Sequence, residues 1–126
     1  MEHISIASTV RSFPDLPYEA IKNAVLGRKY NLSLVFVGER RAQRLNIENR
    51  GKDYIPNVLS FPLSEESGEI FICPKAAQRE AADFGLSYEG YIAFLCIHAC
   101  LHLAGYDHSD EMDRLEQKYL KKFKLS

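Results

Sequence analysis

The chain has 126 residues, a length that fits one domain with a hydrophobic core of its own. Its net charge of -1 gives no overall positive field of the kind that attracts nucleic acid. We expect a cytoplasmic protein with no membrane partner, because the three cysteines lack CxxC spacing and the sequence shows no signal peptide and no apolar stretch of membrane-spanning length. We expect a single domain over residues 1–126.

The pattern of apolar residues predicts four strands and five helices. Alternating or continuously apolar short runs indicate the strands, and longer runs of helix-forming residues indicate the helices. In chain order we expect a strand at 3–9, a helix at 13–29, a strand at 31–38 and a helix at 39–50. Two strands follow at 57–63 and 68–74, and then helices at 75–85, at 88–105 and from 110 onward. The polar stretch SEESG separates the last two strands and predicts a hairpin loop.

Several residues mark the expected helix ends. Asp15 is the expected N-cap of the first helix, Pro17 suits its first turn, and Gly27 suits its end. Ser87 and Ser109 are the expected N-caps of the last two helices. The order βαβαββααα therefore predicts an α/β (α+β) fold, in which a small mixed sheet of about four strands packs with about five helices.

Three of the four histidines lie within HACLHLAGYDH, residues 98–108. His98 and His102 are four residues apart on a predicted helix, so their side chains lie on one face. Gly105 can adopt a positive φ and end that helix, which lets the next turn bring His108 to the same point. Three protein ligands with a fourth position left for water are typical of a catalytic metal site, and imidazole ligands suit zinc better than nickel, copper or iron. We therefore predict one divalent metal ion per chain, with zinc preferred.

The cysteines and the remaining histidine are not expected to join this site. Cys96 and Cys100 lie on the face of the predicted helix opposite the two histidines, and that helix is apolar on nearly all sides. Both are therefore predicted to be small core residues. Cys73 ends a predicted strand and receives no role, and His3 is expected at the surface rather than as a ligand.

The spacing HxxxHxxGxxH is shared with the metzincin proteases, in which a glutamate directly after the first histidine is the general base. Ala99 stands at that position here. General-base catalysis increases a rate by ~10² to 10⁴-fold. The lack of this glutamate therefore disfavours a peptidase, although it leaves the predicted metal ligands unchanged. A zinc metallopeptidase-like hydrolase remains one alternative function. A non-catalytic RNA-binding protein of ribosome assembly, in which the metal ion only supports the fold, is another.

HACLHLAGYDH resembles the HGxLHLxGYDH motif of the YbeY family, the metal-dependent endoribonucleases of ribosomal RNA maturation. Residues 46–62, NIENRGKDYIPNVLSFP, resemble the family's NxxxRxxDxPTNVLSFP segment, and GEIFIC at 68–73 resembles its GDIxI strand. The predicted order of elements is similar too, so the resemblance covers nearly the whole chain. Three departures occur, with Ala99 for a glycine, IPN for PTN and Glu69 for an aspartate, and none falls on a predicted metal ligand.

The resemblance implies an endoribonuclease of the single-strand type that acts in maturation of the small-subunit ribosomal RNA 3′ end and in ribosome quality control. The implied partners are ribosomal RNA and the small ribosomal subunit, with a ribosomal protein or an assembly GTPase as further candidates. A three-histidine metal site can lower the pKa of bound water toward ~7 and polarise a phosphoryl oxygen.

The resemblance also implies roles for individual residues. Arg50 matches the family's arginine, and its planar guanidinium suits a phosphate, so we expect it to be catalytic and to bind substrate. Asn57 and Ser60 are further candidates for substrate binding, and Arg44 is a candidate because it belongs to the basic stretch of residues 28–52. Asp107 is a candidate catalytic residue that either orients a histidine or caps the final helix.

Basic side chains gather in residues 28–52, where seven basic residues against two acidic ones give a local charge of +5. Such a concentration compensates for the near-neutral charge of the whole chain. We therefore expect a basic patch near Arg50 that follows an RNA backbone.

Overall fold

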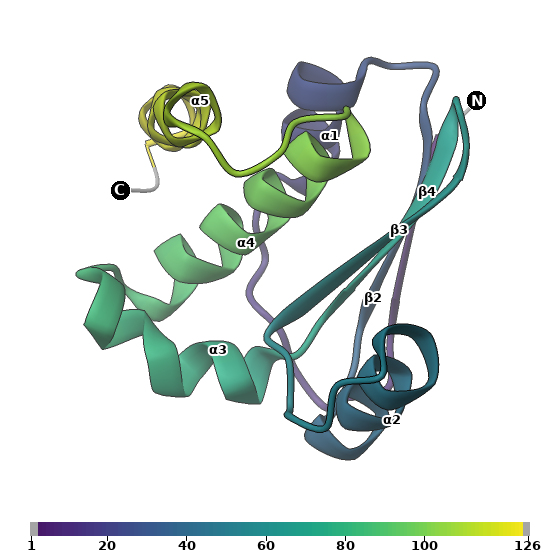
Figure 1. Ribbon diagram of the computed structural model, residues 1–126. Coiled ribbons are helices and arrows are strands. Elements are labelled where there is room, and N and C mark those ends of the chain that lie inside the picture. The colour runs from purple at the N-terminus through teal and green to yellow at the C-terminus, as the bar shows by residue number, and fades with distance from the viewer. Residues whose placement is uncertain (1–2, 125–126) are drawn as a thin grey trace.

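The computed structural model describes residues 3–124, which form a twisted sheet with helices on both faces (Figure 1). The order βαβαββααα is confirmed, except that the helix expected at 75–85 is divided into an α-helix and a 3-10 helix. The elements are β1 (Ile4–Ser8), α1 (Tyr18–Leu26), β2 (Asn31–Phe36), α2 (Glu39–Arg50), β3 (Val58–Ser64), β4 (Ser67–Ile72), α3 (Pro74–Glu80), the 3-10 helix η1 (Ala81–Phe84), α4 (Tyr88–Leu103) and α5 (Asp110–Lys122).

The sheet is mixed, as predicted, with the strand order β1-β2-β4-β3. β2 pairs in parallel with β1 and with β4, whereas β3 and β4 form an antiparallel hairpin. The hairpin turn is tighter than the predicted five-residue loop, because Ser64 and Ser67 pair across the ladder and their hydroxyl groups lie 2.7 Å apart. β3 is therefore an edge strand, and one of its sides stays free of a neighbouring strand.

Successive residues of the inner strands face two different layers, because side chains alternate along a strand. Leu34 and Phe36 of β2 belong to the main core, to which α1, α4 and α5 also contribute. Val35 of β2 and Phe71 of β4 belong to a smaller core that includes Ala42 of α2. Figure 1 shows the result, with α2 on one face of the sheet and the other α-helices on the opposite face.

The central helix α4 is apolar on nearly every side and carries much of the main core. Cys96 and Cys100 are fully buried in it, which confirms their prediction as core residues. Within residues 3–124, no helix by itself has the length and apolar character to cross a membrane; α3 with η1 and α4 meet that test only as a pair bent by 103°.

The predicted caps of the last two helices are confirmed, and that of the first is wrong. The Ser87 hydroxyl accepts from a backbone N–H of α4, and the Ser109 hydroxyl does the same for α5. α1 begins only at Tyr18, with Pro17 as the N-cap residue and no side-chain cap. A residue before proline avoids the helical conformation, so Leu16 stays outside the helix and Asp15 lies too far from its first turn to cap it.

Candidate metal centre

The end of α4 and the turn after it bring three histidines together. His98, His102 and His108 each offer a ring nitrogen, and the three nitrogens lie within 4.8 Å of one another. α4 carries the first two one turn apart, and Gly105, with a φ of +103°, turns the chain so that the third approaches them. The structure therefore groups all three predicted ligands.

The other ring nitrogens of two histidines contact oxygen acceptors. Nδ1 of His98 donates to the Glu116 carboxylate at 2.5 Å, and Nδ1 of His102 donates to the Tyr106 carbonyl oxygen at 3.0 Å. With the protons on Nδ1, the Nε2 lone pairs of His98 and His102 face each other across only 3.2 Å. A cation between them relieves this repulsion, so the donor set fits a metal ion.

The electrostatic surroundings favour the same protonation state. Burial, and then the neighbouring His98, lower the pKa of His102. A lower pKa favours the neutral imidazole, which is the form that binds a metal ion. The site is thus suited to a cation in its charge state as well as in its geometry.

Glu116 is a residue of this site that the sequence analysis missed. It lies on α5, and only 5% of its surface is exposed. Met112 and Leu120, four residues to either side, are buried as well, so the carboxylate interrupts an otherwise apolar stripe. A charged residue within the buried face of an amphipathic helix is the signal that could have identified it.

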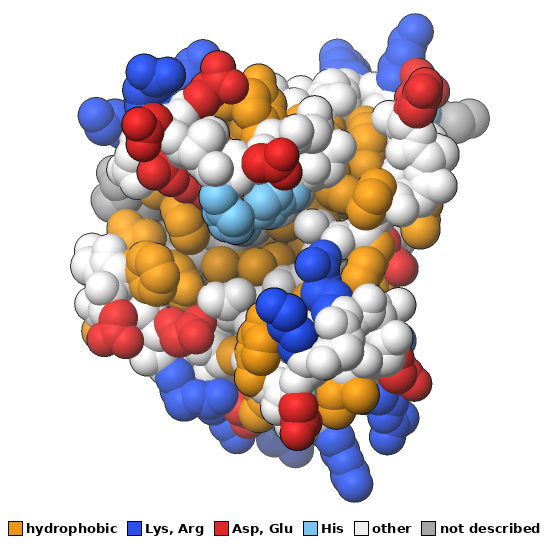
Figure 2. Space-filling view, viewed as in Figure 1, with side chains coloured by type: hydrophobic (Ala, Val, Ile, Leu, Met, Phe, Trp, Pro, Cys, Tyr) orange, Lys and Arg blue, Asp and Glu red, His pale blue; other side chains and the backbone are white. Residues whose placement is uncertain are grey.

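A cleft of about 250 Å³ opens beside the histidines. Its far wall comes from the end of α2 and from the segment that leads into β3, including Arg50, Tyr54 and Asn57. Figure 2 shows the histidines above a hollow with hydrophobic side chains inside it and basic side chains on the facing rim. Within residues 3–124, no carboxylate lines this cleft, and Ala99 lines it where a metzincin has its general base.

Arg50 is the last residue of α2 and reaches the cleft from the side opposite the histidines. Gly51 follows in the left-handed conformation, with a φ of 65°, and ends the helix there. The Arg50 guanidinium donates to the Ser60 carbonyl oxygen at 3.1 Å and lies 5.6 Å from the centre of the Phe61 ring. These contacts direct the guanidinium while leaving most of its five N–H groups for a ligand.

Two of the other candidate residues also line the cleft. Ser60 lies on β3 beneath the Arg50 side chain. The Asn57 side-chain amide donates to the Glu80 carboxylate at 2.7 Å and to the Tyr91 hydroxyl at 3.1 Å. Asn57 therefore attaches the segment before β3 to the helical layer, which holds the two walls of the cleft together.

The remaining two candidates lie apart from the cleft lining. Arg44 is exposed on α2, and Asp107 is exposed in the turn before His108. Ser109, rather than Asp107, caps α5, so that alternative for Asp107 is wrong: the Ser109 hydroxyl lies in position to accept from the Met112 N–H. A catalytic role of Asp107 and a substrate contact of Arg44 stay predictions.

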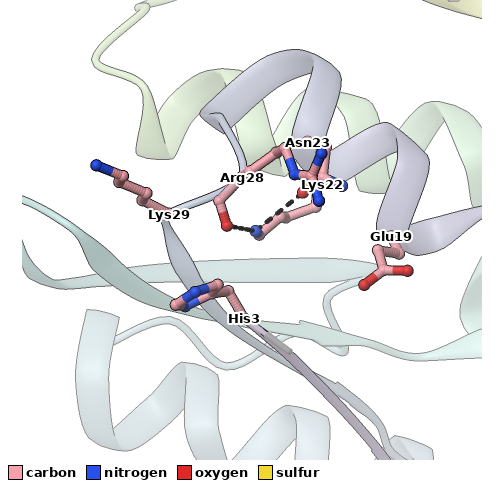
Figure 3. Close-up of a pocket in the computed structure, with 6 residues that line it drawn as sticks. All are labelled: His3, Glu19, Lys22, Asn23, Arg28 and Lys29. Carbon is pink, nitrogen blue, oxygen red and sulfur yellow. Dashed lines mark hydrogen bonds between the residues drawn. The ribbon is translucent and has the colours of Figure 1, made fainter. Parts of the chain in front are cut away.

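The basic segment 28–52 does not form one patch. Arg28 and Lys29 precede β2, whereas the other basic residues follow it, so the strand separates the two groups. Figure 3 shows the first group at a separate pocket, where the buried Lys22 amine donates to the Arg28 carbonyl oxygen at 2.9 Å and to the Asn23 side chain at 3.0 Å. His3 lies at the same pocket and is not part of the histidine group.

The chain is similar along most of its length to known proteins. Residues 3–124 match the model of a family described as endoribonuclease YbeY. A protein of that name from Neisseria meningitidis serogroup B is 37% identical over an alignment of length 124, and the match covers 88% of this chain and 72% of the relative. Another, from Methylobacillus flagellatus, is 45% identical over 82 residues, which cover 63% of this chain and 55% of the relative.

A solved structure shares the fold. The solution structure of TM1509 from Thermotoga maritima matches the fold with a TM-score of 0.67 and 28% sequence identity, covering 95% of this chain and 88% of that one. The resemblance to the YbeY family is confirmed by the family model, which matches residues 3–124. On these matches, the chain belongs to the family of YbeY endoribonucleases.

Proposed function

We propose that this protein is a metal-dependent endoribonuclease that hydrolyses a phosphodiester bond of single-stranded ribosomal RNA in the cytoplasm. The observation that carries the proposal is the position of Arg50, across one cleft from His98, His102 and His108. A phosphate in this cleft would lie between a cation site and a guanidinium, which together match its negative charge. No carboxylate is part of the described lining, so nothing there repels an anion, and the general base that a peptidase needs is missing from it.

The three histidines would hold one divalent ion, for which we propose zinc. Such an ion would supply Lewis-acid chemistry to a phosphoryl oxygen. Glu116 and the Tyr106 carbonyl group keep the two α4 imidazoles oriented toward it.

Arg50 would bind a second phosphoryl oxygen and stabilise the charge that develops during hydrolysis. The Ser60 carbonyl group and the Phe61 ring hold its side chain over the cleft, so little reorganisation is needed when substrate binds. Asn57 maintains the distance between this wall and the histidines. For the partner we propose the small ribosomal subunit at the 3′ end of its RNA, with a ribosomal protein or an assembly GTPase directing the enzyme there.

Single-turnover cleavage of a small-subunit ribosomal RNA fragment tests the proposal. Arg50→Ala should reduce the rate by about 10² to 10³-fold, because it removes one electrostatic donor to the transition state. Arg50→Lys should recover part of the rate, since an ammonium keeps the charge but loses the planar fork. Metal content and melting temperature should hardly change in either variant, because the Arg50 side chain is exposed.

The matched control is Arg11→Ala, which removes an exposed arginine from the loop after β1. A chelated sample excludes contaminating nuclease. Cleavage of casein but not of RNA would favour the peptidase alternative. Wild-type rates in a folded, metal-loaded Arg50→Ala variant would refute the proposed site.

A further inference from the structure

A second hollow, of about 320 Å³, adjoins the metal centre on another side of His98. It shares four lining residues with the first cleft, namely Asn57, Val58, His98 and His108, so one ligand can extend through both. The rest of its lining is dominated by Phe84 from η1 and by residues of α4, including Tyr91 and Phe94. We call this hollow the aromatic pocket.

The rings of the aromatic pocket form a cluster, because Phe84 also lies near Phe94, with ring centres 6.1 Å apart and planes inclined by 33°. Phe84 and Tyr91 have ring centres 4.9 Å apart and planes inclined by 26°. Tyr91 and Phe94 are 6.0 Å apart with an inclination of 10°, and Phe94 and His98 are 5.8 Å apart with an inclination of 29°. Phe84, Tyr91 and Phe94 thus contact one another, and Phe94 continues the cluster to His98, a proposed metal ligand.

Phe84 is the exposed member of this cluster. Its side chain is 58% exposed, although it contacts a ring that is almost completely buried. Removing a phenyl ring from water normally stabilises a fold. A half-exposed ring at the mouth of a pocket keeps apolar surface that a ligand can cover. The ligand that best matches a cluster of flat rings is itself flat and aromatic.

The charge of the pocket distinguishes a base from a phosphate. Asp113 and Glu116 lie in its lining, and their carboxylates repel a second phosphate. A nucleobase carries no net charge, and its N–H groups can donate to a carboxylate. The first cleft has the opposite character, because Arg50 lines it and no described carboxylate does.

We propose that the aromatic pocket binds the base of a nucleotide adjacent to the scissile phosphate, stacked against Phe84 and Phe94. This inference rests on the proposed function and adds a determinant of substrate class. A base that stacks in the pocket has left its own helix, so the enzyme selects unpaired nucleotides. Stacking of a base on an aromatic side chain contributes about 1–3 kcal/mol, which corresponds to about 5- to 150-fold in binding.

A fluorescence titration tests the contact directly. The chain contains no tryptophan, so Phe84→Trp introduces one tryptophan at the mouth of the pocket, which can be excited selectively beside the tyrosines. A short single-stranded RNA should quench its fluorescence, whereas an oligonucleotide with the same backbone and abasic sugars should not. Electrophoresis after the titration verifies that the RNA is intact. Equal responses to both ligands, or no response while anisotropy of a labelled RNA shows binding, would overturn the proposal.

Cleavage kinetics provide the second test. Phe84→Ala should lower kcat/KM for single-stranded RNA by about 5- to 150-fold, mainly through KM. An RNA that is abasic beside the scissile phosphate should be cleaved equally by wild type and by this variant. The matched control is Leu63→Ala, which removes another exposed apolar side chain, on β3 and outside the aromatic pocket.

The two tests separate this inference from the proposed function. If the wild type cleaves RNA but Phe84→Ala retains full kcat/KM, the pocket assignment is wrong and the endoribonuclease stands. If base-dependent quenching occurs in a protein that cleaves no RNA, the pocket assignment stands and the proposed reaction is wrong.

Discussion

Replacement of Glu116 by glutamine should weaken metal binding without unfolding the protein. The wild-type carboxylate accepts a hydrogen bond from Nδ1 of His98, and a glutamine of nearly the same volume removes its negative charge. The side-chain amide can also present its NH2 group to the imidazole, which favours the wrong tautomer. Nε2 of His98 then becomes a poorer ligand.

The expected loss follows from the burial of this pair. The side chains of His98 and Glu116 are only 20% and 7% exposed, so water screens their interaction little. Removing an acceptor that orients a metal-bound histidine typically costs 10- to 100-fold in metal affinity, or about 1.4 to 2.7 kcal/mol. The same factor should separate the zinc dissociation constants of wild type and Glu116→Gln.

Competition with a chromophoric chelator measures these dissociation constants. Glu111→Gln is the matched control, because it makes the same substitution at an exposed position in the first turn of α5. Circular dichroism and the melting temperature of the metal-free proteins report whether both variants are folded. An unchanged zinc affinity in folded Glu116→Gln would refute the reasoning, since the carboxylate would then have no influence on the ligand it contacts.

Three further predictions concern stability and metal content. Cys100→Ala should keep one metal ion per chain by elemental analysis and lose roughly 1 kcal/mol of stability or somewhat more, and loss of metal from a folded variant would contradict the helix phase. Gly68→Ala should destabilise the fold by about 1–3 kcal/mol in urea titrations, because the added Cβ would meet the Tyr30 hydroxyl and lie 3.0 Å from Leu103; an unchanged midpoint would show that these neighbours move freely. Burial raises the pKa of Tyr91 from 10.0 to about 12. Its contribution to the free energy of unfolding is therefore complete below pH 10 and is lost as the pH rises toward 12, by up to about 3 kcal/mol. Tyr91→Phe should lack this loss, and a pH-independent difference in unfolding free energy between the two proteins would contradict the assignment.

The sequence was most informative where structure depends on local spacing. His98 and His102 share a helix face, and Cys96 and Cys100 are buried away from it, because residues four apart occupy similar angles around a helix. Gly105 ends the helix as predicted, since its φ of +103° is unfavourable for other residues. The element order was predictable for the same reason.

Some sequence-based expectations failed because a neighbouring group changed the local outcome. Asp15 does not cap α1, because Pro17 delays the start of that helix. Arg28 and Lys29 do not join the basic residues of α2, because β2 carries the chain from one end of the sheet to the other. Proximity in the sequence does not predict proximity in space when an extended strand lies between two segments.

Tertiary structure alone decided how the separate segments assemble into a site. Glu116 reaches His98 only because α5 packs beside α4. Arg50 faces the histidines only because β3 also lies beside α4. Phe84 completes the aromatic pocket through the turn between η1 and α4. Helical and strand periods specify which face a side chain occupies, whereas the partner of that face depends on the packing of all the apolar surfaces together. The metal ligands could therefore be predicted from one short motif, and the groups that surround them could not.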